Sequence, residues 1–146
     1  MKEIGSIMKR FSKKSAFAYF GTKPTTVRQS WSALSEDERT VAVTIWKDQL
    51  KYKGREPFWD TFNLPENQSN NLWKDSFGNR ERVKHLKHCR DKLDGLFRVV
   101  ITVAVDVNAN PREILEVYPF ENVWMKLQKL DEDTGECYAE YYPKDK

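Results

Sequence analysis

The chain of 146 residues has the length of one domain, and its formal net charge at pH 7 is +3. Charged residues make up 32% and aromatic residues 13%, which excludes intrinsic disorder, because disordered chains have few aromatic residues. No apolar run approaches the roughly 20 residues that span a bilayer, and no secretory signal is visible. We therefore expect a single cytoplasmic domain over residues 1–146, without a membrane partner.

The first 28 residues form a basic arm. Lysine and arginine occur there seven times against one glutamate, a local charge of +6, so the remainder of the chain carries −3. A basic arm on a mildly acidic body is typical of proteins that bind polyanions, although lysine-rich termini also serve as solubilising tails. Apolar spacing predicts an amphipathic helix from about Glu3 to Phe11, and Gly21 and Pro24 predict a turn after it.

Residues 29–50, QSWSALSEDERTVAVTIWKDQL, predict two strands around the polar turn SEDER. One face of the second strand would carry Val41, Val43 and Ile45. On the other face, Trp31 is expected opposite or diagonal to Thr44 and Trp46. Two flat rings over small neighbours would form a shelf on which a base can stack. The alternative is that both tryptophans belong to the core.

Residues 51–78 are rich in Asn, Pro and Gly but also in aromatic side chains. A long loop of this kind either packs over the core or lines a functional site. Trp59 and Trp73 are therefore further candidates for base stacking.

The sequence GNRERVKHLKHCRDKLDG, residues 78–95, predicts the principal helix, with Asn79 as N-cap and Gly95 just past its end. Its outer face is expected to be basic and to include Arg82. Either that face is simply solvated, or it contacts phosphates together with the arm. The candidate phosphate-binding residues are Lys9, Arg10, Lys13, Lys14, Arg28, Arg80, Lys84 and Lys87.

The apolar run LFRVVITVAV, residues 96–105, predicts the central strand of a sheet. A short strand is expected over residues 111–118. Residues 122–142 predict a second hairpin, with Gly135 in its turn. Arg98 and Arg112 are candidates for pairing with a carboxylate or a ligand anion, because a buried arginine needs such a partner.

His85, His88 and Cys89 have a spacing that suits ligands on adjacent helical turns. Zinc would need a fourth ligand such as Cys137, and no CxxC or HExxH pattern occurs. We therefore expect no metal, and free thiols at Cys89 and Cys137. The acidic clusters fall in predicted turns, and no glycine-rich phosphate loop or catalytic constellation is present. No cofactor and no catalytic residue are implied.

The strings SWSA, TVAVTIWKD, NRERVKHLKHCRDKLDGLFRVVITVAVD and NPREI resemble those of uncharacterised bacterial and phage proteins. In that group the first strand reads arginine-tryptophan-serine-tryptophan, and a W-x-D strand and a Pro-Arg-x-Ile segment follow. Gln29 and Ser30 stand here where the group has arginine and tryptophan. The strand–helix–strand order is also similar to PUA- and EVE-like barrels, a likeness that implies a cage of aromatic residues for a modified base.

These observations predict an α+β fold: a small curved sheet or PUA-like barrel of about six strands, with a central amphipathic helix and an N-terminal helix. The favoured function is a nucleic-acid-binding module that reads a flipped or modified base, with DNA favoured over RNA. The alternative is a protein-interaction module, such as a phage-type inhibitor or a subunit of a defence system, whose aromatic residues anchor a protein partner. An enzyme ranks third.

Overall fold

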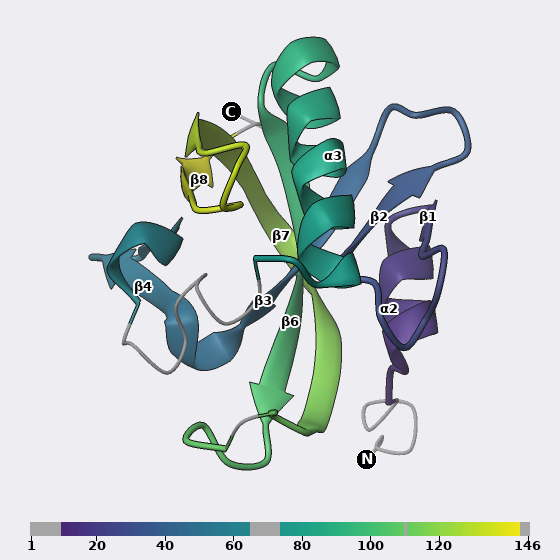
Figure 1. Cartoon of the computed structure of the whole chain (residues 1–146), viewed down its shortest axis with the longest axis vertical. Helices are drawn as coiled ribbons and strands as arrows, with labels where there is room; N and C mark the ends of the chain where they lie inside the picture. Colours follow the sequence, from purple (N-terminus) through teal and green to yellow (C-terminus); the bar gives the residue numbers. More distant parts are fainter. Residues whose placement is uncertain (1–9, 65–73, 110, 144–146) are drawn as a thin grey trace.

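The computed structural model describes residues 10–64, 74–109 and 111–143. In these ranges the chain forms one eight-stranded mixed sheet and two α-helices, which confirms the α+β class (Figure 1). The elements are, in chain order, α2 (Lys13–Tyr19), β1 (Thr22–Lys23), β2 (Ser32–Ser35), β3 (Val41–Trp46), the 3₁₀ turn η1 (Lys47–Gln49), β4 (Leu50–Lys53), β5 (Glu56–Asp60), the 3₁₀ turn η2 (Thr61–Asn63), α3 (Phe77–Lys92), β6 (Leu96–Ala104), β7 (Ile114–Leu130) and β8 (Cys137–Tyr142).

The strand order in the sheet is β1-β2-β3-β6-β7-β8-β5-β4. Among the described strands, β3 and β6 pair in parallel, and the other neighbouring pairs are antiparallel. A parallel pair needs a crossover connection, and α3 forms part of it. In Figure 1, α3 lies in front of the sheet, and β6 and β7 run side by side behind it.

The sheet has a hydrophobic cluster on each face, because successive side chains of a strand point to opposite sides. Val99 of β6 packs with Leu86 and Cys89 of α3. The next residue, Val100, packs with Ala16 and Phe17 of α2. Each helix therefore covers one face of the sheet, and β6 is buried from both sides.

Two of the expected elements are confirmed, with slightly shorter bounds. The first hairpin consists of β2 and β3, with Ser32 opposite Val43 and the turn where SEDER was expected. The run 96–105 matches β6, which is mostly buried and has a neighbour on each side. Gly135 adopts φ +86 in the turn of the second hairpin, a conformation that favours glycine.

The expectation of a six-stranded barrel is wrong. The sheet is open, with β1 at one edge and β4 at the other. Residues 51–60, expected as part of a loop, belong to the hairpin β4–β5, and β1 was not expected at all. The short strand over 111–118 and the strand that follows it are one long strand, β7.

Both helices differ at their ends from the sequence-based expectation. The helix expected from about Glu3 to Phe11 falls largely outside the described residues, and a helix is instead found at Lys13–Tyr19 with Ser12 as N-cap. Ser76, rather than Asn79, caps α3, and its side chain accepts a hydrogen bond from the Asn79 N–H. In the described part of the chain, no helix has the length and apolar character needed to cross a membrane.

Candidate ligand-binding pocket

A pocket of about 190 Å³ brings together three of the candidate tryptophans, and we call it the tryptophan pocket. It is lined by Lys13, Arg28, Trp31, Thr44, Trp46, Gln49, Trp59, Arg82, Thr102, Arg112 and Ile114. Its volume is below the roughly 300–1,000 Å³ of sites for drug-sized ligands. The space therefore suits one small group, such as a single ring system, rather than a large ligand.

The pocket lies where the parallel strands β3 and β6 end. Trp46, the last residue of β3, pairs with Thr102 of β6, and both line the pocket. The crossover brings the first turns of α3, with Arg82, to the same place. Ligands of open α/β sheets bind outside the carboxyl ends of parallel strands, and this parallel pair has its concave site at that end.

Trp31 is held by the register of the first hairpin. Its carbonyl oxygen accepts from the Thr44 N–H at 2.9 Å and from the Thr44 hydroxyl at 3.0 Å. The indole ring lies directly against Gly78 of α3, where a Cβ atom would overlap the ring. Trp31 and Trp46 are both half-buried, so part of each ring faces the pocket.

Arg82 lies between two indole rings. Its guanidinium carbon is 4.9 Å from the centre of the Trp31 ring and 5.3 Å from that of Trp59, which is within cation–π range. The guanidinium also donates to Asn79 Oδ1 at 3.0 Å. Burial lowers the pKa of Arg82 to about 10, so the side chain stays charged at neutral pH.

The position of Arg82 corrects the sequence analysis, which placed it on the basic outer face of the helix. The residue is only 3% exposed. The sequence does not reveal this burial, because it depends on Trp59 of the unexpected strand β5 and on Trp31 from the first hairpin.

Arg112 packs over Trp46 at 5.0 Å from its ring centre, on another side of the pocket. It forms a two-pronged ion pair with Asp48, at 2.7 and 2.8 Å, and also donates to the Val107 carbonyl. This is an ion pair of the kind expected for Arg112. The ion pair holds the segment before β7 against η1. One face of the Arg112 guanidinium remains packed on the indole ring of Trp46.

Lys13 and Arg28 complete the cationic lining and come from α2 and from the segment before β2. Burial lowers the pKa of Lys13, and the Glu81 carboxylate opposes that shift. Four cations thus line the pocket together with three tryptophans, and no carboxylate is among the described lining residues. The arrangement can hold a flat group that is linked to an anion.

Trp59 differs from the other two tryptophans because it is both core and lining. It is 1% exposed and packs edge-on against Phe97 in the main cluster. In the described part of the chain, its indole Nε1–H has no hydrogen-bond partner. An unpaired buried donor costs free energy, which a ligand acceptor in the pocket would recover.

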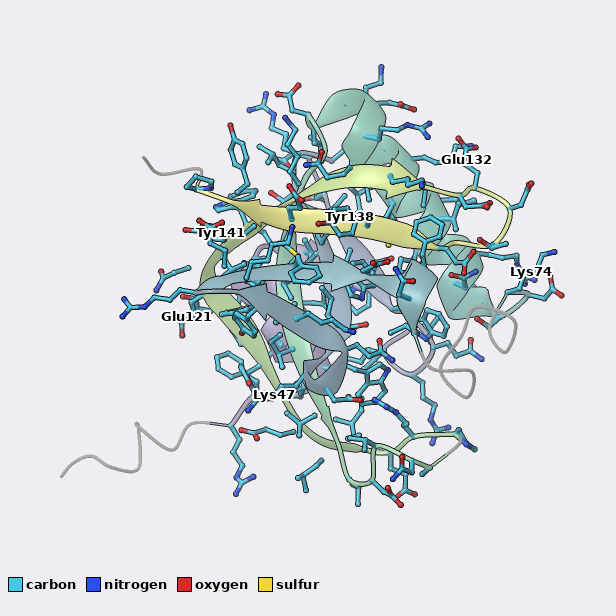
Figure 2. All side chains as sticks on the ribbon, turned by 90° about the vertical axis from the view of Figure 1, so that its left-hand side faces the viewer. Lys47, Lys74, Glu121, Glu132, Tyr138 and Tyr141 are labelled. Carbon is cyan, nitrogen blue, oxygen red and sulfur yellow. The ribbon has the colours of Figure 1, made fainter. Side chains whose placement is uncertain are left out.

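The remaining candidates lie elsewhere. Trp73 and Lys9 are outside the described residues, and Arg10 and Lys14 are exposed and do not line the pocket. Arg80 and Lys84 line a neighbouring groove beside α3. Lys87 pairs with Glu132 at 3.2 Å, and Figure 2 shows Glu132 beside α3, in the turn that leads into β8.

Arg98 lies on the α2 side of the sheet and does not line the tryptophan pocket. Its guanidinium carbon is 4.3 Å from the centre of the Phe20 ring and 4.4 Å from that of Trp124. It donates to the carbonyl oxygens of Glu121 and Val123. These contacts hold α2 and β7 against β6, so the role of Arg98 is to stabilise the fold.

The histidines and cysteines make separate contacts. His85 Nδ1 shares a 2.6 Å hydrogen bond with the Ser32 hydroxyl, and His88 Nε2 lies 2.7 Å from the Glu38 carbonyl oxygen. Cys89 and Cys137 are buried and free. Burial raises the pKa of Cys89 to about 12 and that of Cys137 to about 11. Among the described residues, no three His, Cys, Asp or Glu side chains are grouped as a metal site.

Sequence reasoning missed two buried polar residues that line the pocket. Gln49 and Thr102 line it and are 4% and 3% exposed. Thr102 is the one polar residue inside the apolar run 99–105, and this interruption is the sequence signal that could have identified it.

Comparison with models of known protein families, with curated proteins and with solved structures finds no match to this chain.

Proposed function

We propose that this protein is a nucleic-acid-binding module whose tryptophan pocket receives one unpaired base. The observation that carries the proposal is the meeting of Trp31 and Trp46 with Lys13 and Arg28 in a single pocket. Aromatic rings stack on any base, and stacking contributes roughly 1–3 kcal/mol per base. Lysine and arginine beside the rings would hold the attached phosphate.

The size of the pocket favours an unpaired base over a base within a duplex. A base in a duplex has both faces covered, so it must be flipped out or come from a single strand. A volume of about 190 Å³ leaves room for one such group. We propose DNA as the first target and RNA as the second, in the cytoplasm, a compartment that suits two free buried cysteines.

The test is a titration of short fluorescein-labelled oligonucleotides, followed by anisotropy at two salt concentrations. Single-stranded and double-stranded DNA and the matching RNA are compared. Trp46→Ala should weaken binding by roughly 1–3 kcal/mol. Lys13→Ala should weaken binding to all sequences about equally and lower the slope of log Kd against log salt by about one.

Lys92→Ala is the matched control, because Lys92 is an exposed cation at the far end of α3 and lines neither the pocket nor the groove. It should leave the affinity nearly unchanged. The proposal fails if wild-type protein binds none of the oligonucleotides, or if Lys92→Ala and Lys13→Ala have the same effect.

One observation favours the second candidate function, a protein-interaction module of the phage-inhibitor or defence-subunit kind. Four apolar side chains are exposed where β6 and β7 meet, namely Val105, Val107, Ile114 and Leu115. Leu115 is 64% exposed, and exposed apolar surface is typical of protein contacts, although Ile114 also lines the tryptophan pocket. A Leu115→Ser variant separates the two functions, because it should not alter nucleic-acid affinity if the tryptophan pocket is the binding site.

A further inference from the structure

A second concave site lies beside α3, and we call it the α3 groove. It has a volume of about 640 Å³ and is lined by Thr25, Phe77, Arg80, Glu81, Lys84 and His85. None of these residues lines the tryptophan pocket. The two sites nevertheless adjoin, since Glu81 of the groove and Arg82 of the pocket are consecutive residues of α3.

Glu81 contributes a buried carboxylate with one unused oxygen. The residue is only 8% exposed. Its Oε2 accepts a hydrogen bond from the Thr25 hydroxyl, whereas Oε1 has no hydrogen-bond partner among the residues that the structure describes. A buried carboxylate oxygen without a donor is costly. Glu81 lines the groove, so a ligand N–H or O–H that displaces the atoms covering this oxygen satisfies it.

The surroundings of Glu81 restrict the kind of ligand. Arg80 and Lys84 are exposed cations that line the same groove. They would repel a lysine or arginine side chain that approached the carboxylate, and they would attract an anion. The ligand that suits the groove thus has a neutral donor near Glu81 and a negative charge near the two cations.

Phe77 adds a flat apolar contact. It is the first residue of α3, is 40% exposed and lines the groove. An exposed aromatic ring next to cations is a surface on which a base stacks while its phosphate is neutralised. A carboxylate is also the acceptor that proteins use for the exocyclic amino group of cytosine.

We propose that the α3 groove is a second nucleotide subsite in which Glu81 Oε1 accepts a hydrogen bond from the exocyclic amino group of a base. This inference rests on the proposed nucleic-acid-binding function and specifies it further. Arg80 and Lys84 hold the phosphate of that nucleotide, and Phe77 supports the ring. A strand that crosses both sites then places one base in each, and thymine is disfavoured in the groove because its O4 would face the carboxylate.

The test compares fluorescein-labelled oligo(dC) and oligo(dT) of equal length, by anisotropy at low salt. Wild-type protein should bind oligo(dC) about tenfold more tightly, as expected for one hydrogen bond to a charged acceptor. Glu81→Met removes the acceptor and keeps the side-chain length, so it should erase this preference while oligo(dT) affinity stays the same or rises. Glu36→Met, an exposed turn residue outside both sites, is the charge-matched control and should keep the preference.

The outcomes distinguish this inference from the proposed function. Equal wild-type affinity for the two oligonucleotides overturns the inference and leaves the function standing. The inference is also overturned if the preference persists in folded Glu81→Met. If neither oligonucleotide binds wild-type protein, the proposed function fails and the subsite with it. The wild-type comparison needs no substitution, so a poorly folding variant does not prevent a decision.

Discussion

At the scale of single residues, the three tryptophans of the pocket have different structural roles. Trp59 is 1% exposed and belongs to the main core cluster, whereas Trp31 and Trp46 are half-buried. The same residue type thus serves as scaffold in one position and as accessible lining in two others. Sequence alone left these alternatives open, because burial depends on what the neighbouring strands cover.

Stability measurements on two alanine variants should show this difference. Trp59→Ala should lower the free energy of unfolding by about 3–5 kcal/mol, because it opens a large cavity in the core. Trp46→Ala should cost clearly less, since part of the ring already faces solvent. Urea unfolding followed by far-ultraviolet circular dichroism measures both values. Equal losses would make Trp46 part of the scaffold and remove it as a stacking residue.

His85 should make stability depend on pH. Burial lowers its pKa in the folded protein; Glu81 raises that pKa, and His88 and Lys84 lower it further. A histidine whose folded pKa lies below its unfolded value of about 6.5 binds protons more readily when unfolded. Its contribution to stability is therefore complete above that unfolded value and is lost as the pH falls towards the folded pKa.

The measurement is the urea midpoint between neutral and mildly acidic pH, for wild type and for His85→Gln. Wild-type protein should become less stable as the pH falls through the histidine range, and the variant should show a flatter profile. The carboxylates with lowered pKa, such as Glu132 and Asp91, titrate at lower pH and do not obscure the result. A variant profile as steep as that of wild type would assign the effect to other groups.

At the scale of elements, the start of α3 determines the shape of the tryptophan pocket. Gly78 has no side chain, which allows the Trp31 ring to lie against the helix. Gly78→Ala should improve helix propensity by about 1 kcal/mol, yet it forces the ring to move. We expect weaker oligonucleotide binding and a changed tryptophan fluorescence spectrum in a protein that remains folded.

The coupling between these two residues provides the control. If the effect of Gly78→Ala acts through the ring, then adding it to Trp31→Ala should bring no further loss of affinity. Independent, additive losses in the double variant would mean that Gly78 affects binding by another route.

Elements with a strong local pattern were predictable, and those without one were not. The first hairpin has alternating side chains around SEDER, and β6 is a continuous apolar run, so both were found. The hairpin β4–β5 was missed because Gly54 and Pro57 interrupt it. Gly54 has φ +64 in its turn, and Pro57 precedes the residues that pair with β8, where its missing N–H does no harm.

The tryptophan pocket was likewise predictable only where it depends on local sequence. Hairpin register was enough to bring Trp31 and Trp46 together, because it is a local property. The burial of Arg82 and the pairing of Arg112 with Asp48 were less accessible, since each depends on segments far apart in the chain. Residue spacing contains no information about such contacts.

At the scale of the whole molecule, the open sheet has two edges that require protection from pairing with other chains. β1 is only two residues long, and β4 has exposed Lys51 and Lys53. Short edge strands and edge lysines both discourage such pairing.

The sequence did not predict that the sheet is open. The order of the strands and the closure of a sheet into a barrel depend on pairings between segments that are distant in sequence.

Hydrogen exchange should follow this architecture. Amides of β6 should exchange most slowly, because the strand has a neighbour on each side and a helix over each face. Amides of β1 and β4 should exchange fastest among the strands. Mass spectrometry of peptic fragments measures this order, and rapid exchange across residues 96–104 would contradict the central position of β6.

The lining of the tryptophan pocket has a consequence for folding. Its residues range from Lys13 to Ile114 and come from both helices, from β3, β5, β6 and β7, and from the segment before β2. No shorter stretch of chain contains the whole site, so a ligand binds only after these segments have assembled. Occupancy then stabilises the folded state by mass action, by about 2.7 kcal/mol at a ligand concentration one hundred times Kd. A rise in melting temperature with added oligonucleotide would therefore report on long-range assembly as well as on affinity.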